Sequence, residues 1–417
     1  MKIHIALRDP TIRRLSTAQA LSVIGDGCNS VALAFAVVML TDSTTLLSMA
    51  LAARVVGLTI SLLAGGVMAD RFDRRRILIC SDLVRFAAQG ALALLLLGDS
   101  TGVPAIVGLQ LVHGLASGFF LPTYGGFVAR LVSADQLQQT NAAITTVAGI
   151  ASVVGPALAG SLTAAVGPAW ALGLDALTFL GSAAIIASCG HFLPRADSLA
   201  VMDRPARSAL QDMYSGWREV LRRRWLSAGI SYFVISQLCI TGPLYVLGPL
   251  MADQHLGGAS IWGLLLTAFA IGGVLGGMLA ARYEPRRPMV AMLICAVFIC
   301  PLLIAFSVRS HVVVLIAVEI LAGAAIMFTD ILWQSTMQTH VPDAVLSRVL
   351  SWDLLGYTVS RPLSIGLVGP AAQAVGAGAT FMGAAVALGV VAALTMSLRE
   401  VRTLGRRATD QPLESSV

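Results

Sequence analysis

The amino-acid sequence predicts an all-α membrane protein with twelve transmembrane helices in two pseudo-symmetric six-helix bundles. Three features of the chain favour this fold: its composition, its series of apolar segments and an internal repeat. Of the 417 residues, 57% are hydrophobic and only 12% are charged, whereas a typical soluble domain has about 25% charged residues. The mean hydropathy of +0.82 indicates that lipid surrounds most of the chain.

The apolar segments have the length that a membrane requires, about 20 residues for a spanning helix. Hydropathy and turn residues separate twelve of them, six in each half: residues 15–40, 45–69, 77–98, 103–121, 141–166, 169–192, 226–251, 260–281, 289–308, 312–333, 349–371 and 378–398. The first is longer than the core of a signal peptide, roughly 7 to 15 residues, so we expect a retained helix.

These segments define the expected organisation. Residues 1–193 form the N-terminal bundle, 194–225 a cytoplasmic central loop, 226–399 the C-terminal bundle and 400–417 a cytoplasmic tail. The central loop is expected to contain an amphipathic helix, since Leu210, Met213, Tyr214, Trp217 and Leu221 recur at helical spacing. A connector packed on the ends of the spans is favoured over a lipid-sensing helix.

The arginines predict the orientation, because basic residues stay cytoplasmic in short loops. Of the 28 basic residues, 24 lie in the two terminal segments, the central loop and the other loops on that side. Arg309 alone lies on the opposite side, and Arg54, Arg85 and Arg361 lie within spans. Both termini are therefore expected on the cytoplasmic side of a bacterial inner membrane. Topology explains the net charge of +6, so no nucleic-acid partner is expected.

The chemistry-bearing residues argue against an enzyme. Six cysteines lie inside apolar runs without paired close spacing, so neither a disulfide framework nor a zinc site is expected. No lysine is available for a phosphate-binding glycine loop, which argues against an ATP-driven pump. We expect no cofactor and no metal.

An internal repeat relates the two halves. The segment from Gly65 to Arg76 aligns without gaps to the segment from Gly276 to Arg287, with six of twelve positions identical. Each copy follows the second span of its half. Two halves with parallel repeats form the architecture in which transporters alternate access around a midplane site.

The first copy carries a recognisable motif, Gly66-x-x-x-Asp70-Arg71-x-Asp73-Arg74-Arg75. It resembles the loop signature of the major facilitator superfamily, in which glycine is usual where this chain has Asp73. Aspartate followed by three arginines resembles the branch of this superfamily that contains macrolide-efflux proteins and the enterobactin exporter.

The resemblance implies two conformational elements. The first is a latch between the halves formed by Gly66, Asp70, Arg71, Arg74 and Arg75, with Asp70 against the start of the eleventh helix. Asp82 and Arg85 either extend this latch or form a local intrahelical pair. The second is a hinge in the fifth helix at Gly155, Pro156 and Gly160, which resembles a motif of drug/proton antiporters.

Charged residues inside the membrane are the candidates for proton coupling, because an ionised carboxylate at the midplane is unfavourable unless paired, protonated or hydrated. Asp26 lies at the centre of its span, and Arg54 in the next span is its expected counter-ion. A static structural ion pair is the alternative. Asp175 and Glu319 are further candidates, and Asp330, Asp353 and Arg361 are expected to form gate pairs or structural contacts.

The substrate cavity is expected between helices 1, 4, 7 and 10, which line it in this family. Sparse polar and aromatic side chains supply its anchors: Asn29, Gln110, His113, Gln237, Tyr245, Trp333 and Gln334. A wide apolar cavity with few polar groups suits amphipathic or lipophilic compounds better than sugars. For His113, a hydrogen-bonded helix contact is favoured over a proton relay.

The sequence thus predicts a monomeric secondary transporter that exports small molecules such as antibiotics, other drugs, natural products or siderophores in exchange for protons. Its partners are the small-molecule substrate, protons and the lipid bilayer. Two alternatives remain: proton-coupled uptake of a nutrient, and a non-transporting membrane sensor or lipid translocator.

Overall fold

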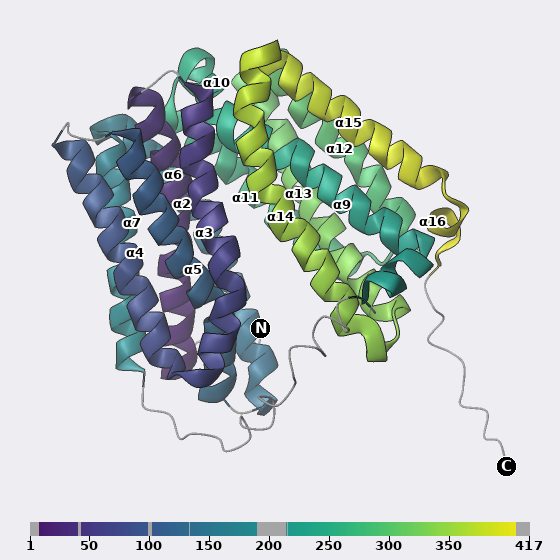
Figure 1. The fold of residues 1–417 in the computed structure, drawn as a ribbon, viewed down its shortest axis with the longest axis horizontal. Coiled ribbons are helices and arrows are strands. Elements are labelled where there is room, and N and C mark those ends of the chain that lie inside the picture. The colour runs from purple at the N-terminus through teal and green to yellow at the C-terminus, as the bar shows by residue number, and fades with distance from the viewer. Residues whose placement is uncertain are drawn as a thin grey trace.

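The computed structural model describes residues 8–40, 43–98, 102–132, 134–189, 214 and 216–405. The described residues fold into helices, and these ranges contain no strand (Figure 1). The first half contains α2 (Pro10–Leu40), α3 (Thr44–Arg71), α4 (Arg74–Leu97), α5 (Val103–Leu131), α6 (Ala134–Val166) and α7 (Pro168–Ser188). The second contains α9 (Arg224–Gly242), the π-helix η2 (Pro243–Leu247), α10 (Gly248–Met251), the π-helix η3 (Ala252–Leu256), α11 (Ala259–Arg282), α12 (Pro288–Ser307), α13 (Val312–His340), α14 (Asp343–Val375), α15 (Ala377–Ser397) and α16 (Arg399–Thr403).

Among the described residues, eleven helices are long and apolar enough to cross a membrane, with α9 through η3 counted as one run. The twelfth is α14, in which Arg361 and neighbouring Ser, Gly and Pro residues lower the mean hydropathy. Together they confirm the predicted twelve-helix membrane fold.

Several helices are longer than their predicted apolar segments. The extensions occur at the end where α2 begins and α15 ends, called here the terminal end: α2 starts at Pro10, α5 runs to Leu131, and α13 runs to His340. A backbone hydrogen-bond ladder continues without apolar side chains, so hydropathy marks where the membrane ends and not where a helix ends.

The two halves have the same packing plan. In the first, α3 packs on α5, α4 on α7 and α2 on α6; in the second, α11 packs on α13, α12 on α15 and α9 on α14. The contacts between the halves are also equivalent, since α14 packs on α3 and α6 packs on α11. The repeat found in one loop therefore extends to whole six-helix bundles.

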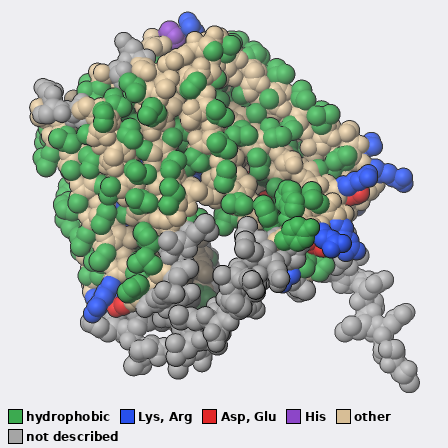
Figure 2. All heavy atoms as spheres, viewed as in Figure 1, with side chains coloured by type: hydrophobic (Ala, Val, Ile, Leu, Met, Phe, Trp, Pro, Cys, Tyr) green, Lys and Arg blue, Asp and Glu red, His purple; other side chains and the backbone are tan. Residues whose placement is uncertain are grey.

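The bundles meet at the far end, opposite the terminal end, and diverge toward the terminal end (Figure 1). At the far end Thr44 Oγ1 donates a hydrogen bond of 3.3 Å to the Gly369 carbonyl. Figure 2 shows the visible face hollowed between the bundles toward the terminal end. The structure is thus closed at one end and open at the other.

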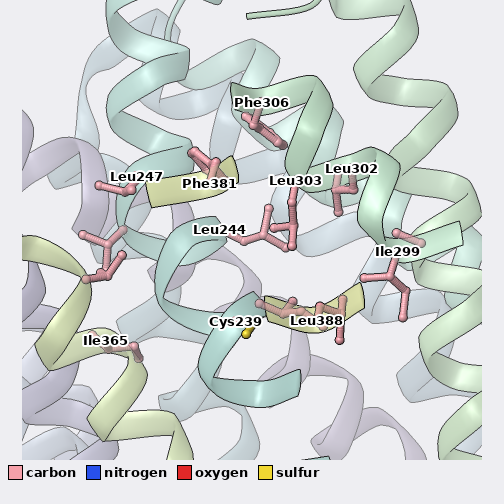
Figure 3. Packing of buried hydrophobic residues seen from close by; sticks show 14 of the residues in the cluster. Cys239, Leu244, Leu247, Ile299, Leu302, Leu303, Phe306, Ile365, Phe381 and Leu388 are labelled. Atoms are coloured by element: carbon pink, nitrogen blue, oxygen red, sulfur yellow. The ribbon is translucent and has the colours of Figure 1, made fainter. Parts of the chain in front are cut away.

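The second bundle is held by a continuous apolar core (Figure 3). The rings of Phe306 and Phe381 stack with centroids 5.2 Å apart and join α12 to α15. Leu244 and Leu247 bring η2 into the same cluster. The π-helical segment is therefore anchored in the core.

The central connection is described only in part. Residues 216–222 are helical, and the Trp217 ring lies 4.8 Å from the Trp352 ring of α14. Leu210 and Met213 of the predicted amphipathic helix lie outside the described residues, as do residues 406–417 of the predicted tail.

Candidate transport site

Asp26 and Arg54 form an ion pair between the middle of α2 and the middle of α3. The Arg54 Nη2 group donates a hydrogen bond to Asp26 Oδ1. Both side chains stay accessible, with exposed fractions of 41% for Asp26 and 22% for Arg54. The sequence predicted this pairing, and the exposure leaves the carboxylate open to a second partner.

A buried chain of polar groups runs through the first bundle. Gln89 Nε2 donates a hydrogen bond of 2.7 Å to Asp175 Oδ2. Gln110 Nε2 donates to Gln89 Oε1 at 3.2 Å and to Asn29 Oδ1 at 3.3 Å. All four side chains are buried, so Asn29 and Gln110 join the interior of the bundle instead of a cavity wall. Sequence reasoning missed Gln89, although a glutamine within an apolar span was a visible signal.

Asp82 and Arg85 pair with each other within α4, as the local alternative predicted. The Arg85 guanidinium lies 4.2 Å from the Phe120 ring centroid and 4.3 Å from that of Phe179. These aromatic faces add cation–π attraction to the ion pair. His113 is fully buried with its ring 5.5 Å from the Phe179 ring. Among the described residues neither of its ring nitrogens has a hydrogen-bond partner, so the expected hydrogen-bonded helix contact was wrong and His113 packs against an aromatic ring instead.

The arginine-rich loop is organised by helix ends. Asp73 is the N-cap of α4, and its carboxylate accepts a hydrogen bond of 2.9 Å from the Arg75 backbone N–H. The Arg75 guanidinium donates to the carbonyls of Ile186 and Ala187 at the end of α7, and Arg14 donates to Ser188. Cations at a helix C-terminus are stabilised by the helix dipole.

The rest of the predicted latch has two parts. Arg74 lies against Gly126 of α5, where its guanidinium occupies the space of a Cβ atom. Gly66, Asp70 and Arg71 belong to α3, but the surroundings of Gly66 and the side chains of Asp70 and Arg71 lie outside what the structure describes. The latch role of Asp70 therefore stays a prediction.

The predicted hinge of the fifth helix lies at two close helix contacts. A Cβ atom built on Gly155 is 2.8 Å from the Ile24 carbonyl oxygen of α2. One built on Gly160 is 2.7 Å from the Ala259 carbonyl oxygen of α11 and 2.9 Å from the Gly263 Cα atom. Pro156 lies between these glycines, so the motif joins α6 to its own bundle and to the other one.

A pocket of about 150 Å³ lies in the second bundle. The predicted residues Gln237, Tyr245 and Glu319 line it together with Arg361. The segment η2, which carries Tyr245, packs on α3, the helix of Arg54, which relates the pocket to the Asp26–Arg54 pair. The remaining lining residues are Ile240, Thr241, Leu244, Trp262, Leu266, Phe269, Ile326 and Tyr357.

Trp333 and Gln334 lie elsewhere. Trp333 is buried and its Nε1 donates a hydrogen bond of 2.9 Å to Asp353 Oδ1. Gln334 is exposed. Periodicity does not distinguish the cavity face of a helix from its other faces when both carry polar residues.

Beside the pocket, Ser364 of α14 interrupts the seventh span. Its Oγ accepts a hydrogen bond of 2.7 Å from the Gly242 N–H and donates one of 2.7 Å to the Leu238 carbonyl. The π-helix η2 follows directly and carries Tyr245. Sequence reasoning missed Ser364, although Gly242-Pro243 marked a weak point of the span.

Comparison with known proteins agrees with this geometry. The sequence model of one protein family, the Major Facilitator Superfamily, matches residues 15–365. The enterobactin exporter EntS of Shigella boydii serotype 4 (strain Sb227) is 25% identical over 355 residues, which are 84% of this chain and 82% of that protein.

Two solved structures are similar in fold. A variant of the nucleoside transporter NupG has a TM-score of 0.76 at 14% identity, over 93% of this chain and 99% of that one. The xylose transporter XylE from E. coli has a TM-score of 0.69 at 14% identity, over 98% of each chain.

Proposed function

Because this chain belongs to the major facilitator superfamily, we propose that this membrane transporter exports amphipathic or lipophilic small molecules in exchange for protons. The terminal end, which is open, then faces the cytoplasm of a bacterial cell. The cytoplasmic orientation is supported by the arginines, which the sequence concentrates on the side of the termini.

The observation that carries the proposal is the accessible Asp26–Arg54 pair between the middle parts of the spanning helices α2 and α3. When a proton binds the carboxylate, the ion pair is lost and Arg54 is left without its counter-ion. A proton and a cationic substrate group therefore compete for Asp26. Such competition couples proton entry to substrate release, because each conformation then prefers one occupant.

The nature of the substrate is supported by two facts. The polar groups of the pocket stand among apolar and aromatic side chains, which suits amphipathic molecules. The relatives that match over most of the chain are named enterobactin exporters, which favours siderophores within the wider group of drugs and natural products.

The test is transport into everted membrane vesicles with an acidic interior. A proton-coupled exporter accumulates lipophilic drugs or a siderophore inside these vesicles, and an uncoupler abolishes the accumulation. Vesicles without the protein are the control. Accumulation only in right-side-out vesicles would establish uptake in place of export. No transport in either kind of vesicle would refute both export and uptake.

A further inference from the structure

An acidic and a basic side chain, Glu319 and Arg361, line the pocket of the second bundle without pairing with each other. Glu319 of α13 is 2% exposed and makes no hydrogen bond or ion pair within the described part of the chain. Arg361 of α14 has a buried Nε atom with no hydrogen-bond partner among the described residues. Its Nη1 donates a long hydrogen bond of 3.4 Å to the Tyr357 hydroxyl, and its guanidinium lies 5.7 Å from the centroid of the Tyr357 ring.

This arrangement differs from that of the two acid–arginine pairs within the spans. Asp26 pairs with Arg54, and Asp82 pairs with Arg85. An ionised carboxylate is unfavourable when it is buried without a partner, so Glu319 is stabilised when a cation binds beside it. Arg361 is half-buried and lacks a carboxylate partner among the described residues, so the two residues present an acidic and a basic group to the same space. A ligand with both charges satisfies both groups at once.

From this geometry we propose that the pocket binds a zwitterionic head group, with an ammonium on Glu319 and a carboxylate on Arg361. This inference specifies the substrate class of the proposed exporter. It rests on the proposed function, because only a transporter has the pocket as its substrate site. The planar guanidinium fork suits a carboxylate, which accepts two parallel hydrogen bonds from it.

The other lining residues indicate what accompanies the head group. Trp262, Leu266 and Phe269 form an apolar wall, which suits an aromatic or aliphatic substituent. Thr241 Oγ1 donates to Gln237 Oε1 at 3.4 Å, which leaves the Gln237 amide N–H groups for a ligand. The volume of about 150 Å³ is below the ~300–1,000 Å³ of sites for drug-sized ligands, so a larger substrate extends beyond the pocket.

Three small compounds with one phenyl ring test the charge requirement. Homophenylalanine has both charges, 3-phenylpropylamine lacks the carboxylate, and 4-phenylbutanoic acid lacks the ammonium. Equilibrium dialysis of the radiolabelled compounds against the purified full-length protein gives their affinities. We expect homophenylalanine to bind at least about tenfold more tightly than either relative, a difference of about 1.4 kcal/mol, because each relative lacks one of the two charged hydrogen-bonding groups.

Two variants assign the charges and serve as each other's folding control. Glu319→Gln should weaken the binding of homophenylalanine and of the amine about tenfold, while the affinity for the acid does not fall. Arg361→Met should weaken the binding of homophenylalanine and of the acid, while the affinity for the amine does not fall. Equal affinities of the three compounds for the unsubstituted protein, or equal losses for all three in both variants, would overturn the proposal.

Binding and transport separate this inference from the proposed function. If the vesicles accumulate lipophilic compounds but the protein does not bind homophenylalanine more tightly than its two relatives, the zwitterion site is wrong and proton-coupled export stands. If the preference and its dependence on Glu319 and Arg361 are found without proton-driven transport, the site stands and the proposed export is wrong.

Discussion

Ser364 of α14 inserts its hydroxyl between the Gly242 N–H and the Leu238 carbonyl, the two groups that bond directly in an unbroken α-helix. Gly242 permits this approach, because a Cβ atom there would lie 2.7 Å from Ser364 Oγ and 2.8 Å from its carbonyl carbon. A hydroxyl of one helix thus completes the hydrogen bonding of another next to Tyr245. The seventh and eleventh spans are therefore coupled at the edge of the pocket.

Ser364→Ala should lower the free energy of unfolding by about 1–3 kcal/mol, because it leaves buried backbone groups without their partner. It should also increase amide hydrogen exchange in residues 238–247. Ser360→Ala is the matched control, since the Ser360 hydroxyl donates to the Tyr357 carbonyl of its own helix. Equal effects of the two substitutions would refute the coupling between the helices.

Asp73 stands where the family signature usually has glycine, and in this structure it caps α4. As the N-cap of α4 it satisfies a backbone N–H, so Asp73→Ala should lower the free energy of unfolding by about 1 kcal/mol, and Asp73→Gly by only a few tenths. Denaturant titration of the purified protein measures both. Equal losses for alanine and glycine would contradict a capping role.

Gly160→Val should prevent the close approach of α6 and α11 that closes the far end. Its Cβ atom would meet the Ala259 carbonyl of the other bundle, so the conformation open at the far end gains population. Spin labels at Leu40 and Val375, which are exposed near the far end, should report longer distances. Gly149→Val in the same helix is the control, because a Cβ atom there meets nothing within 4 Å. An unchanged distance in Gly160→Val would exclude this contact as a determinant of closure.

Asp26→Asn should abolish uncoupler-sensitive export while the protein remains in the membrane. The amide keeps the shape of the side chain but neither carries the charge that pairs with Arg54 nor titrates as a carboxylate does. Asp253→Asn is the control, since Asp253 is exposed in η3, outside the paired charges. Full proton-dependent transport by Asp26→Asn would rule out Asp26 as the coupling residue.

The candidate site illustrates how far periodicity and hydropathy reach. The Asp26–Arg54 pair was predictable, because two opposite charges in adjacent spans have few other ways to be satisfied. The assignment of Asn29 and Gln110 to a cavity was not reliable, since a polar residue in a span serves equally as a link within a bundle. The hydrogen bonds that Gln110 donates to Gln89 and to Asn29 depend on how α2, α4 and α5 pack.

The sequence by itself determined the membrane environment, the twelve spans, the two related halves and the superfamily. Each of these follows from local composition or from a repeated motif, and none of them requires knowledge of which helices touch. Only the tertiary structure decided that the far end is closed, that Ser364 interrupts the seventh span, and that Glu319 and Arg361 share a pocket without pairing. Those features depend on contacts between residues far apart in the chain, where the approach of two helices is set by the packing of whole bundles.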